Sequence, residues 1–254
     1  MDIREIAVAA IEELVAWHTV GIIGDAGPGH GSGIGTGTAA SWRGLNLILT
    51  ASHVVERSDP YNLEFLFRPP GNIERTSTDQ PGSALTDGLV FAQKVKILGV
   101  RVSTADDLAA LPVSSEIAAL HNVGFYALDS RDAVPSNRTR VVFTGFPAAL
   151  GERVARSGLV VAHRNIAHQT VVGQPSFDDF DPKRNFACDY TFGDGPVEPM
   201  GISGAGVWFD RGSDELVWRA KLGFAGVLTA YHRKRGIVEG IRAEVVRDFL
   251  DSLL

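Results

Sequence analysis

Cysteine and long apolar runs are the two features that this sequence most clearly lacks. The 254 residues include a single cysteine, Cys188, so no intramolecular disulfide can form, and a secreted fold stapled by disulfides is excluded. No segment approaches the roughly 20 consecutive apolar residues that a membrane-spanning helix needs. The first residues, Met1–Glu5, are charged, and Glu12 and Glu13 interrupt the apolar residues that follow, which is unlike a signal peptide. We therefore expect a cytoplasmic, reducing location and no association with membranes.

Positive charge is scarce as well. Lys and Arg number 24 against 30 Asp and Glu, which gives a net charge of -6 and a pI of about 5.6. A short basic cluster, His232–Arg235, is too small to offset this charge, so we expect no nucleic-acid partner. The 44% of hydrophobic and 21% of charged residues are typical of an ordinary globular protein. With 28 glycines and 12 prolines but only 8% aromatic residues, the composition indicates many turns and favours a β-rich fold.

The pattern of apolar residues predicts a helix at each end of the chain and short strands between them. Residues 2–17 carry apolar side chains at spacings of three and four, with Asp2 placed to cap the helix, and the last residues repeat this periodicity. We interpret the first helix as a packing helix, with a partner-docking or regulatory arm as the alternative. The glycine-rich segment 24–37 is expected to be a loop. Strands are expected at 20–23, 45–49, 63–67, within 89–102, and at 141–144, 158–162, 206–209 and 224–229. Many short strands between terminal helices favour barrels or a sandwich.

A histidine motif follows the predicted strand at 45–49. Gly35-Thr36-Gly37 precedes this strand, and Thr50-Ala51-Ser52-His53 comes directly after it. An imidazole is neutral near pH 7, so it can take a proton from a serine and return it to a leaving group. The arrangement resembles the chymotrypsin-like serine proteases, in which Gly-Thr-Gly leads through a strand to Thr-Ala-x-His. The resemblance implies that His53 is the general base.

A second motif, Gly201-Ile202-Ser203-Gly204, resembles the Gly-x-Ser-Gly nucleophile loop of the same family. The resemblance implies that Ser203 is the nucleophile and that the backbone N–H groups of Gly201 and Ser203 form the oxyanion hole. Loss of one such donor typically lowers the rate about 100- to 1000-fold, because the donors stabilise the charge that develops on the carbonyl oxygen. The family pattern continues Gly-Gly-Pro, whereas this chain has Gly204-Ala205-Gly206. We expect that departure to alter the strand that follows rather than the chemistry.

The segment Asp107–Leu111 resembles the acid motif of the family, Asp-[Leu/Ile/Val]-Ala-x-Leu. The resemblance implies that Asp107 orients His53 and stabilises its charged form. The chain order of His53, Asp107 and Ser203 is that of chymotrypsin-like enzymes. On an extended chain the neighbouring Asp106 would face the opposite way. An alternative alignment places Asn122 at the acid position and would make the triad defective.

The resemblance runs from about Gly35 to about Ile241 and is strongest to the disulfide-free bacterial trypsin-like peptidases. It implies a mainly β fold of two six-stranded antiparallel β-barrels with N-terminal and C-terminal helices. Within one peptidase domain over 1–254, we expect the helix at 1–17, the first barrel at 18–113, an inter-barrel linker at 114–135, the second barrel at 136–242 and the last helix at 243–254. The implied activity is that of a serine endopeptidase on a protein or peptide substrate. No metal or organic cofactor is expected, since His163, His168 and Cys188 match no zinc-binding spacing.

Specificity and activation can also be read from the resemblance. The residue six positions before the serine lies at the base of the primary specificity pocket in this family, and here it is Val197. A valine cannot pair with a cation, so we expect an apolar or small residue before the scissile bond. The strand that ends at Thr229 and Ala230 resembles the one that borders the substrate cleft and pairs with substrate backbone. Ile202 stands where secreted members carry an Asp that pairs with a freshly cut N-terminus, so any regulation would need loop ordering or an unidentified partner.

Two other functions stay open at this point. A catalytically impaired pseudo-protease would use the same fold as a protein-binding module, and the Asn122 alignment and the altered Gly204–Gly206 stretch keep this alternative alive. An esterase is the third hypothesis, because the same triad hydrolyses activated esters.

Overall fold

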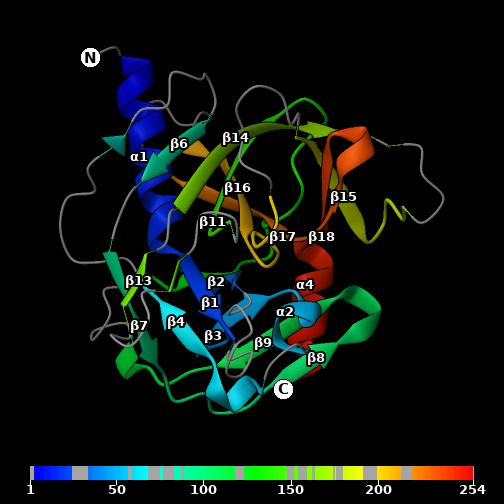
Figure 1. The fold of residues 1–254 in the computed structure, drawn as a ribbon. Coiled ribbons are helices and arrows are strands. Elements are labelled where there is room, and N and C mark those ends of the chain that lie inside the picture. Colours follow the sequence, from blue (N-terminus) through cyan, green and yellow to red (C-terminus); the bar gives the residue numbers. More distant parts are fainter. Residues whose placement is uncertain are drawn as a thin grey trace.

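Two β-sheets make up most of the molecule, one in the lower half and one in the upper half of Figure 1. The structure is a computed structural model of the chain. It describes residues 3–24, 34–56, 59–67, 75–76, 83–86, 89–117, 123–147, 152–153, 159–161, 164–173, 175, 180–190, 199–212 and 219–253.

The first sheet comes mostly from the N-terminal half of the chain. Its strand order is β12-β13-β7-β4-β1-β2-β3-β9-β8, all antiparallel, and the short β10 lies parallel to β2. Ile22, Ile48 and Phe65 from this sheet are at most 1% exposed and form the centre of its core. The strands are β1 (Thr19–Ile23), β2 (Ile34–Trp42), β3 (Leu45–Thr50), β4 (Glu64–Leu66), β7 (Leu89–Lys94), β8 (Arg101–Ser103), β9 (Leu108–Pro112), β10 (Tyr126–Ala127), β12 (Glu152–Arg153) and β13 (Leu159–Val161).

The second sheet closes on itself. Strands β11, β16, β17, β18, β15 and β14 pair in that order, and β14 pairs again with β11, which completes a closed six-stranded barrel. Phe143, Phe186 and Val207 fill its interior, and the thiol of Cys188 is buried among them. The strands are β11 (Arg140–Gly145), β14 (Arg164–Val172), β15 (Asn185–Asp189), β16 (Gly206–Asp210), β17 (Leu222–His232) and β18 (Ile237–Arg242), with β5 (Arg75–Thr76) and β6 (Ser83–Thr86) added beside β14.

Two short hairpins cross between the halves of the sequence. The hairpin of β5 and β6 comes from the range predicted for the first barrel, but β6 pairs with β14 of the second. The hairpin of β12 and β13 comes from the range predicted for the second barrel, but β13 pairs with β7 of the first sheet. The sequence predicted the strand near 159–161, whereas its partner depends on long-range pairing that local periodicity does not encode.

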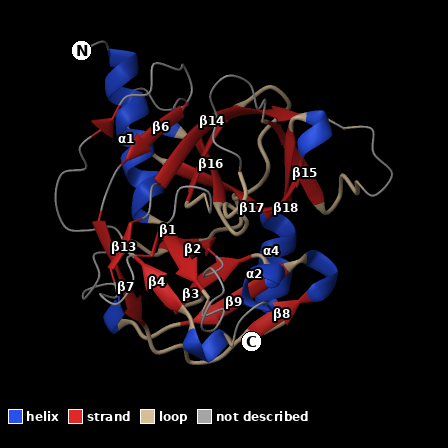
Figure 2. Ribbon diagram, in the orientation of Figure 1, coloured by secondary structure: helices blue, strands red, loops and turns tan. Residues whose placement is uncertain are grey.

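The described residues include three α-helices, and helices are drawn in blue in Figure 2. Helix α1 (Ile3–Trp17) places Val15 in a core that both sheets share, and α4 (Ala243–Asp251) adds Val246 and Phe249 to the same core. Helix α2 (Ser52–Glu56) follows β3. The prediction of a mainly β fold with a helix at each end is therefore confirmed. The predicted cap Asp2 lies outside the described residues.

The glycine-rich segment before β3 is not wholly a loop. Strand β2 begins at Ile34, so Gly35 and Gly37 are strand residues. A Cβ atom on Gly35 would lie 2.4 Å from Cγ1 of Val54, and one on Gly37 would lie 2.5 Å from Cγ2 of Ile48. The two glycines therefore allow close packing on both sides of the strand. The prediction of a loop over 24–37 is wrong for residues 34–37.

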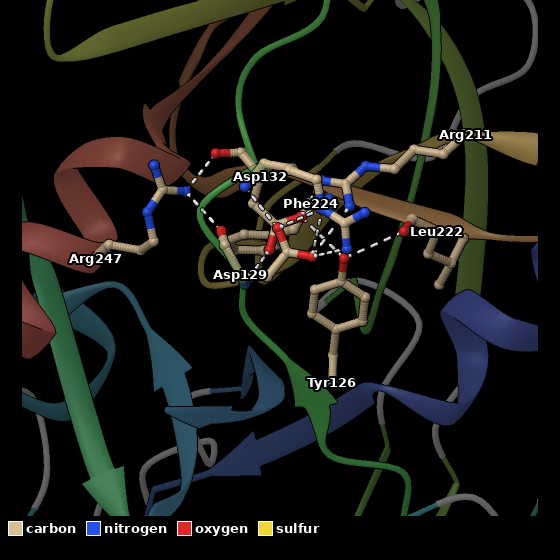
Figure 3. Close-up of polar contacts among 8 residues, drawn as sticks. Tyr126, Asp129, Asp132, Arg211, Leu222, Phe224 and Arg247 are labelled. Carbon is tan, nitrogen blue, oxygen red and sulfur yellow. Dashed lines mark hydrogen bonds and ion pairs between the residues drawn. The ribbon is translucent and has the colours of Figure 1, made fainter. Parts of the chain in front are cut away.

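A buried carboxylate fastens the inter-barrel linker to the second barrel. The Asp132 side chain is 0% exposed. Its Oδ1 accepts hydrogen bonds from the Tyr126 hydroxyl (2.9 Å), from Nη2 of Arg211 (2.6 Å) and from the N–H of Phe224 (3.0 Å), as Figure 3 shows. Burial and the Asp132 charge raise the pKa of Tyr126, so its hydroxyl stays protonated and donates. Arg247 of α4 donates to the Asp132 carbonyl oxygen, so linker, barrel and last helix meet at one residue.

Candidate active site

Strand β3 leads directly into the short helix that carries His53. The strand ends at Thr50, and α2 begins at Ser52. Ser52 and Val55 are buried and hold the helix on the sheet, whereas the His53 side chain is 32% exposed. His53 therefore lies just beyond the strand, as the sequence predicted, although on a turn of helix.

Asp107 binds the start of this helix through both its carboxylate and its backbone. Its Oδ2 lies 2.8 Å from Nδ1 of His53, and its Oδ1 accepts from the His53 N–H (3.1 Å) and from the Ser52 hydroxyl (2.9 Å). The Asp107 carbonyl oxygen also accepts from the Ser52 N–H at 3.1 Å. The first N–H groups of a helix have no acceptors within it, and here Asp107, which directly precedes β9, accepts from two of them. Because a carboxylate accepts only, Nδ1 of His53 is the donor, which leaves Nε2 of the neutral ring as the acceptor.

The backbone of Asp107 is in the left-handed region, with φ 49° and ψ 43°. It follows the 3-10 turn Thr104–Asp106 and directly precedes β9. Aspartate tolerates this conformation better than most residues. The sequence analysis placed Asp106 on an extended chain, and this is wrong, because Asp106 belongs to the turn and not to a strand.

The electrostatics of the pair follow from the same contacts. Burial alone would raise the pKa of the Asp107 carboxyl, but the hydrogen bonds and charge of His53 and the hydrogen bond from Ser52 outweigh burial and lower it. Asp107 is therefore ionised at neutral pH. An ionised carboxylate at Nδ1 holds the imidazole in the tautomer that presents Nε2 as a base.

Two successive turns shape the loop that carries Ser203. The N–H of Ile202 donates to the Pro199 carbonyl oxygen (3.1 Å), and the N–H of Ala205 donates to the Ile202 carbonyl oxygen (2.9 Å). The third residue of each turn is a glycine with positive φ, 96° at Gly201 and 94° at Gly204. A type II turn requires this conformation at its third position, which explains both glycines of Gly-x-Ser-Gly. Ser203 is the second residue of the second turn.

Threonines of the first sheet hold this loop. The N–H of Thr36 donates to the Ser203 carbonyl oxygen (3.0 Å), and the Thr36 hydroxyl donates to the Gly201 carbonyl oxygen (2.8 Å). The Thr50 hydroxyl in turn donates to the Thr36 carbonyl oxygen (2.7 Å). Thr50 is three residues before His53, so the loop with Ser203 and the helix with His53 are joined through two buried side chains. The sequence analysis quoted both threonines in motifs but gave them no role.

The groups expected to act on a substrate are not hydrogen-bonded to one another among the described residues. Among the described residues, the Ser203 hydroxyl makes no hydrogen bond with His53, and the N–H groups of Gly201 and Ser203 donate to no protein acceptor. Hydrogen bonds of this kind often tighten only when substrate binds. The serine loop can therefore offer a substrate the Ser203 hydroxyl and the N–H groups of Gly201 and Ser203. His53, on α2, offers a base whose tautomer is fixed by Asp107.

Strand β17 runs directly behind the serine loop. The Leu228 carbonyl oxygen accepts from the Gly204 N–H (2.7 Å), and the Leu228 N–H donates to the Ala205 carbonyl oxygen (2.9 Å). Thr229 lies at a bulge between the paired residues Leu228 and Ala230. The two residues predicted to border the substrate cleft thus follow the segment that holds the Ser203 loop, with Thr229 buried and Ala230 exposed.

Two predicted residues cannot be placed. Val197, proposed for the specificity pocket, and Asn122, the alternative to Asp107, both lie outside the described residues. Met200, next to the oxyanion residue Gly201, is 63% exposed.

The described part of the chain contains no group of three His, Cys, Asp or Glu side chains arranged to hold a metal ion. None of its helices is long and apolar enough to cross a membrane. A hollow of about 270 Å³ lies on the second barrel between Val171, Phe186 and Arg242, and no predicted catalytic residue lines it.

Comparisons with known proteins show the fold and the family. The structure is similar to an inactivated protease paralogue of the scabies mite (16% identity, TM-score 0.56, 95% of this chain and 96% of that one), and to the human heparin binding protein (15%, 0.58, 93% and 90%). It is also similar to a protease of M. tuberculosis in its active form (16%, 0.54, 97% and 85%). No curated protein matches the sequence. The model of the trypsin-like peptidase domain matches residues 35–214, which is more than half of the chain. The chain therefore belongs to the trypsin-like peptidase family.

Proposed function

We propose that the protein is a serine endopeptidase with Ser203 as nucleophile, His53 as general base and Asp107 as the residue that orients His53. The observation that carries the proposal is the contact between Nδ1 of His53 and Oδ2 of Asp107 at 2.8 Å. This contact sits on a helix joined through Thr50 and Thr36 to the loop of Ser203.

The reaction follows from this arrangement. The Ser203 Oγ bonds to the carbonyl carbon of the substrate while Nε2 of His53 takes the hydroxyl proton. The C–N bond then breaks, and His53 gives the proton to the leaving amine, which leaves an acyl ester on Ser203. A water molecule, deprotonated by His53, attacks this ester and regenerates the hydroxyl. The N–H groups of Gly201 and Ser203 stabilise the negative oxygen that forms in both steps.

We further propose a preference for an apolar or small residue before the scissile bond, because Val197 offers no charge to pair with Lys or Arg. Substrate backbone would pair along β17 near Thr229 and Ala230. We propose no activation by a freshly cut N-terminus, since Ile202 precedes the serine and is 5% exposed in the core of the second barrel.

The experiment is the digestion of a denatured protein mixture with the wild type and with Ser203→Ala, followed by mass spectrometry of the new termini. Termini produced by the wild type and absent with Ser203→Ala would support the endopeptidase, and enrichment of apolar or small residues before the cut would support the specificity. Equal sets of termini from both proteins would contradict the proposal, and dominant cleavage after Lys or Arg would contradict the specificity alone.

A second function, a protein-binding module without catalysis, is favoured by one observation: among the described residues the Ser203 hydroxyl and His53 are not hydrogen-bonded. The fold itself is compatible with both functions, because it is shared by an inactivated paralogue and by an active protease. Under this alternative, Ser203→Ala changes neither the termini produced nor the proteins captured by the chain.

A further inference from the structure

The residue before the catalytic acid is held by the opposite barrel. Asp106 directly precedes Asp107, and its side chain is only 13% exposed. Its Oδ2 accepts from the Ser103 hydroxyl at 2.7 Å. Its Oδ1 accepts from Nη2 of Arg184, which comes from the second barrel. The turn that presents Asp107 to His53 is therefore bonded on one side to its own sheet and on the other side to the barrel that carries Ser203.

Arg184 reaches Asp106 from a firmly anchored position. Its N–H donates to the Asp181 carbonyl oxygen (3.0 Å), and its carbonyl oxygen accepts from the Arg242 N–H (2.9 Å). The next residue, Asn185, starts β15 and pairs with Ile241 of β18. The backbone of Arg184 is thus fixed to the closed barrel, while its guanidinium binds Asp106 beside the first sheet.

The turn around Asp107 depends on such a contact. The backbone hydrogen bond that closes it, from the Asp107 N–H to the Thr104 carbonyl oxygen, is long at 3.4 Å. Asp107 must also keep a left-handed conformation, and its carboxylate must meet the His53 ring and the start of α2 together. A small rotation of the turn would move both carboxylate oxygens away from these donors. Asp106 is the adjacent residue, so its two side-chain bonds restrain that rotation.

We propose that the ion pair of Arg184 and Asp106 positions Asp107 for catalysis and keeps the acid turn of the first sheet in register with the second barrel. Arg184 is a positioning residue, because it touches none of the reacting atoms. The inference rests on the proposed function and extends it to the contact between the first sheet and the second barrel. The bonds of Thr36 hold the two sheets together at the serine, and the Arg184–Asp106 pair does so at the acid.

Because the Arg184 side chain is partly exposed, its positioning role can be distinguished from a contribution to the stability of the fold. The Arg184 side chain is 46% exposed, and ion pairs at such positions contribute little to the free energy of unfolding. Removal of the pair should therefore leave the folded state intact. Reaction geometry is far more sensitive, since a displacement of about 1 Å can lower a rate about 100-fold.

The test compares Arg184→Gln, Asp106→Asn and Arg184→Lys with the control Arg43→Gln. Arg43 forms an ion pair with Asp251 at 2.8 Å and is 58% exposed, so its loss removes a comparable contact elsewhere. The probe is a fluorophosphonate, whose covalent reaction with Ser203 is followed by intact mass to give a maximal rate and an apparent affinity.

We expect Arg184→Gln and Asp106→Asn to lower the maximal rate by up to about fivefold, which is the largest restraint that a partly exposed ion pair provides, with the affinity and the unfolding midpoint nearly unchanged. Arg184→Lys should recover part of the rate, and the paired substitution Asp106→Arg with Arg184→Asp should recover more than either single change. Arg43→Gln should react as the wild type does. A labelled wild type with equal rates for Arg184→Gln would overturn the inference and leave the proposed function standing.

If the wild type does not react with the fluorophosphonate, a proton NMR spectrum still distinguishes the proposed function from the positioning role of the Arg184–Asp106 pair. The His53 Nδ1–H proton bonded to a carboxylate resonates downfield of the amide protons. We expect this resonance in the wild type and in Arg43→Gln, and its loss or broadening in a folded Arg184→Gln. That result with an unlabelled wild type would refute the proposed function alone. Persistence in Arg184→Gln, or absence from the wild type, would overturn the positioning role.

Discussion

Substitution of Gly204 by alanine probes the contact between the serine loop and the first sheet. A Cβ atom at this position would lie 1.9 Å from the Thr36 carbonyl oxygen and 2.3 Å from the Thr50 hydroxyl. Real Cβ atoms do not approach this closely, and the nearer neighbour is backbone, so the loop must move. Its φ of 94° adds strain for any residue with a side chain.

The magnitude can be worked from the bonds that the movement breaks. Displacing the turn breaks three hydrogen bonds. The Thr38 hydroxyl donates to the Gly204 carbonyl oxygen (3.0 Å), the Gly204 N–H to the Leu228 carbonyl oxygen (2.7 Å) and the Thr36 N–H to the Ser203 carbonyl oxygen (3.0 Å). Each contributes about 1 kcal/mol, and the left-handed backbone costs alanine about 1–2 kcal/mol. We expect Gly204→Ala to lower the free energy of unfolding by about 4–5 kcal/mol, a large share of the stability of an ordinary domain.

Gly44→Ala is the matched control, because Gly44 also has a positive φ, 83°, but a Cβ there meets nothing within 4 Å. We expect this variant to lose only the conformational term of about 1–2 kcal/mol. Urea unfolding followed by tryptophan fluorescence measures both losses. Equal losses for Gly44→Ala and Gly204→Ala would refute the claim that the serine loop is wedged against Thr36.

Three further predictions concern buried or titrating groups. Asp132→Ala should lower the free energy of unfolding by about 3–5 kcal/mol, because the Arg211 guanidinium, the Tyr126 hydroxyl and the Phe224 N–H all lose their shared acceptor and Arg211 keeps, among the described carboxylates, only the longer contact with Asp129 at 3.6 Å, and a loss below about 1 kcal/mol in urea unfolding would contradict this. The lowered pKa of Asp107 stabilises the fold above the ordinary carboxylate pKa of about 3.9, and this contribution is lost as the pH falls through the lower folded value. The stability advantage of the wild type over Asp107→Asn, measured by urea titrations from pH 6 downward, should therefore shrink with acid, and a constant difference would argue against the ion pair. Burial raises the pKa of Cys188 to about 12, so this thiol should resist alkylation at pH 8 until the protein is unfolded, and rapid labelling of the native protein would contradict its burial.

Local motifs predicted the positions of His53 and Ser203 in the fold better than the sequence predicted the connections between distant elements. Thr-Ala-x-His and Gly-x-Ser-Gly encode local geometry, a residue beyond a strand and a serine between two turn glycines, so His53 and Ser203 could be located from neighbouring residues alone. Asp107 was found by its motif, but its left-handed backbone was not, because that conformation depends on contacts with Ser52 and Thr104.

Features that depend on long-range contacts were missed. The role of Asp132 could not be inferred, since its partners Arg211 and Phe224 are 79 and 92 residues away. Strands β14, β15 and β18 were likewise not predicted. Their side chains fit the closed barrel and do not alternate regularly between apolar and polar residues along the strand. In the sequence, Asp132 stands beside Asp129 and Arg131 and resembles one member of an exposed cluster of charged residues. Nothing in the local sequence indicates that its side chain is buried.

The most direct test of the central claim is the reaction of the native protein with a fluorophosphonate, read by intact mass. The account predicts one added probe per chain on the wild type, its loss in Ser203→Ala, and a strongly reduced rate in His53→Ala and Asp107→Asn, by about 10,000-fold where the oriented base is disrupted. Ser203→Ala should fold as stably as the wild type, so the loss of label would report the nucleophile. Absence of label on a folded wild type, or the same label on Ser203→Ala, would contradict the assignment of Ser203, His53 and Asp107 as a working triad.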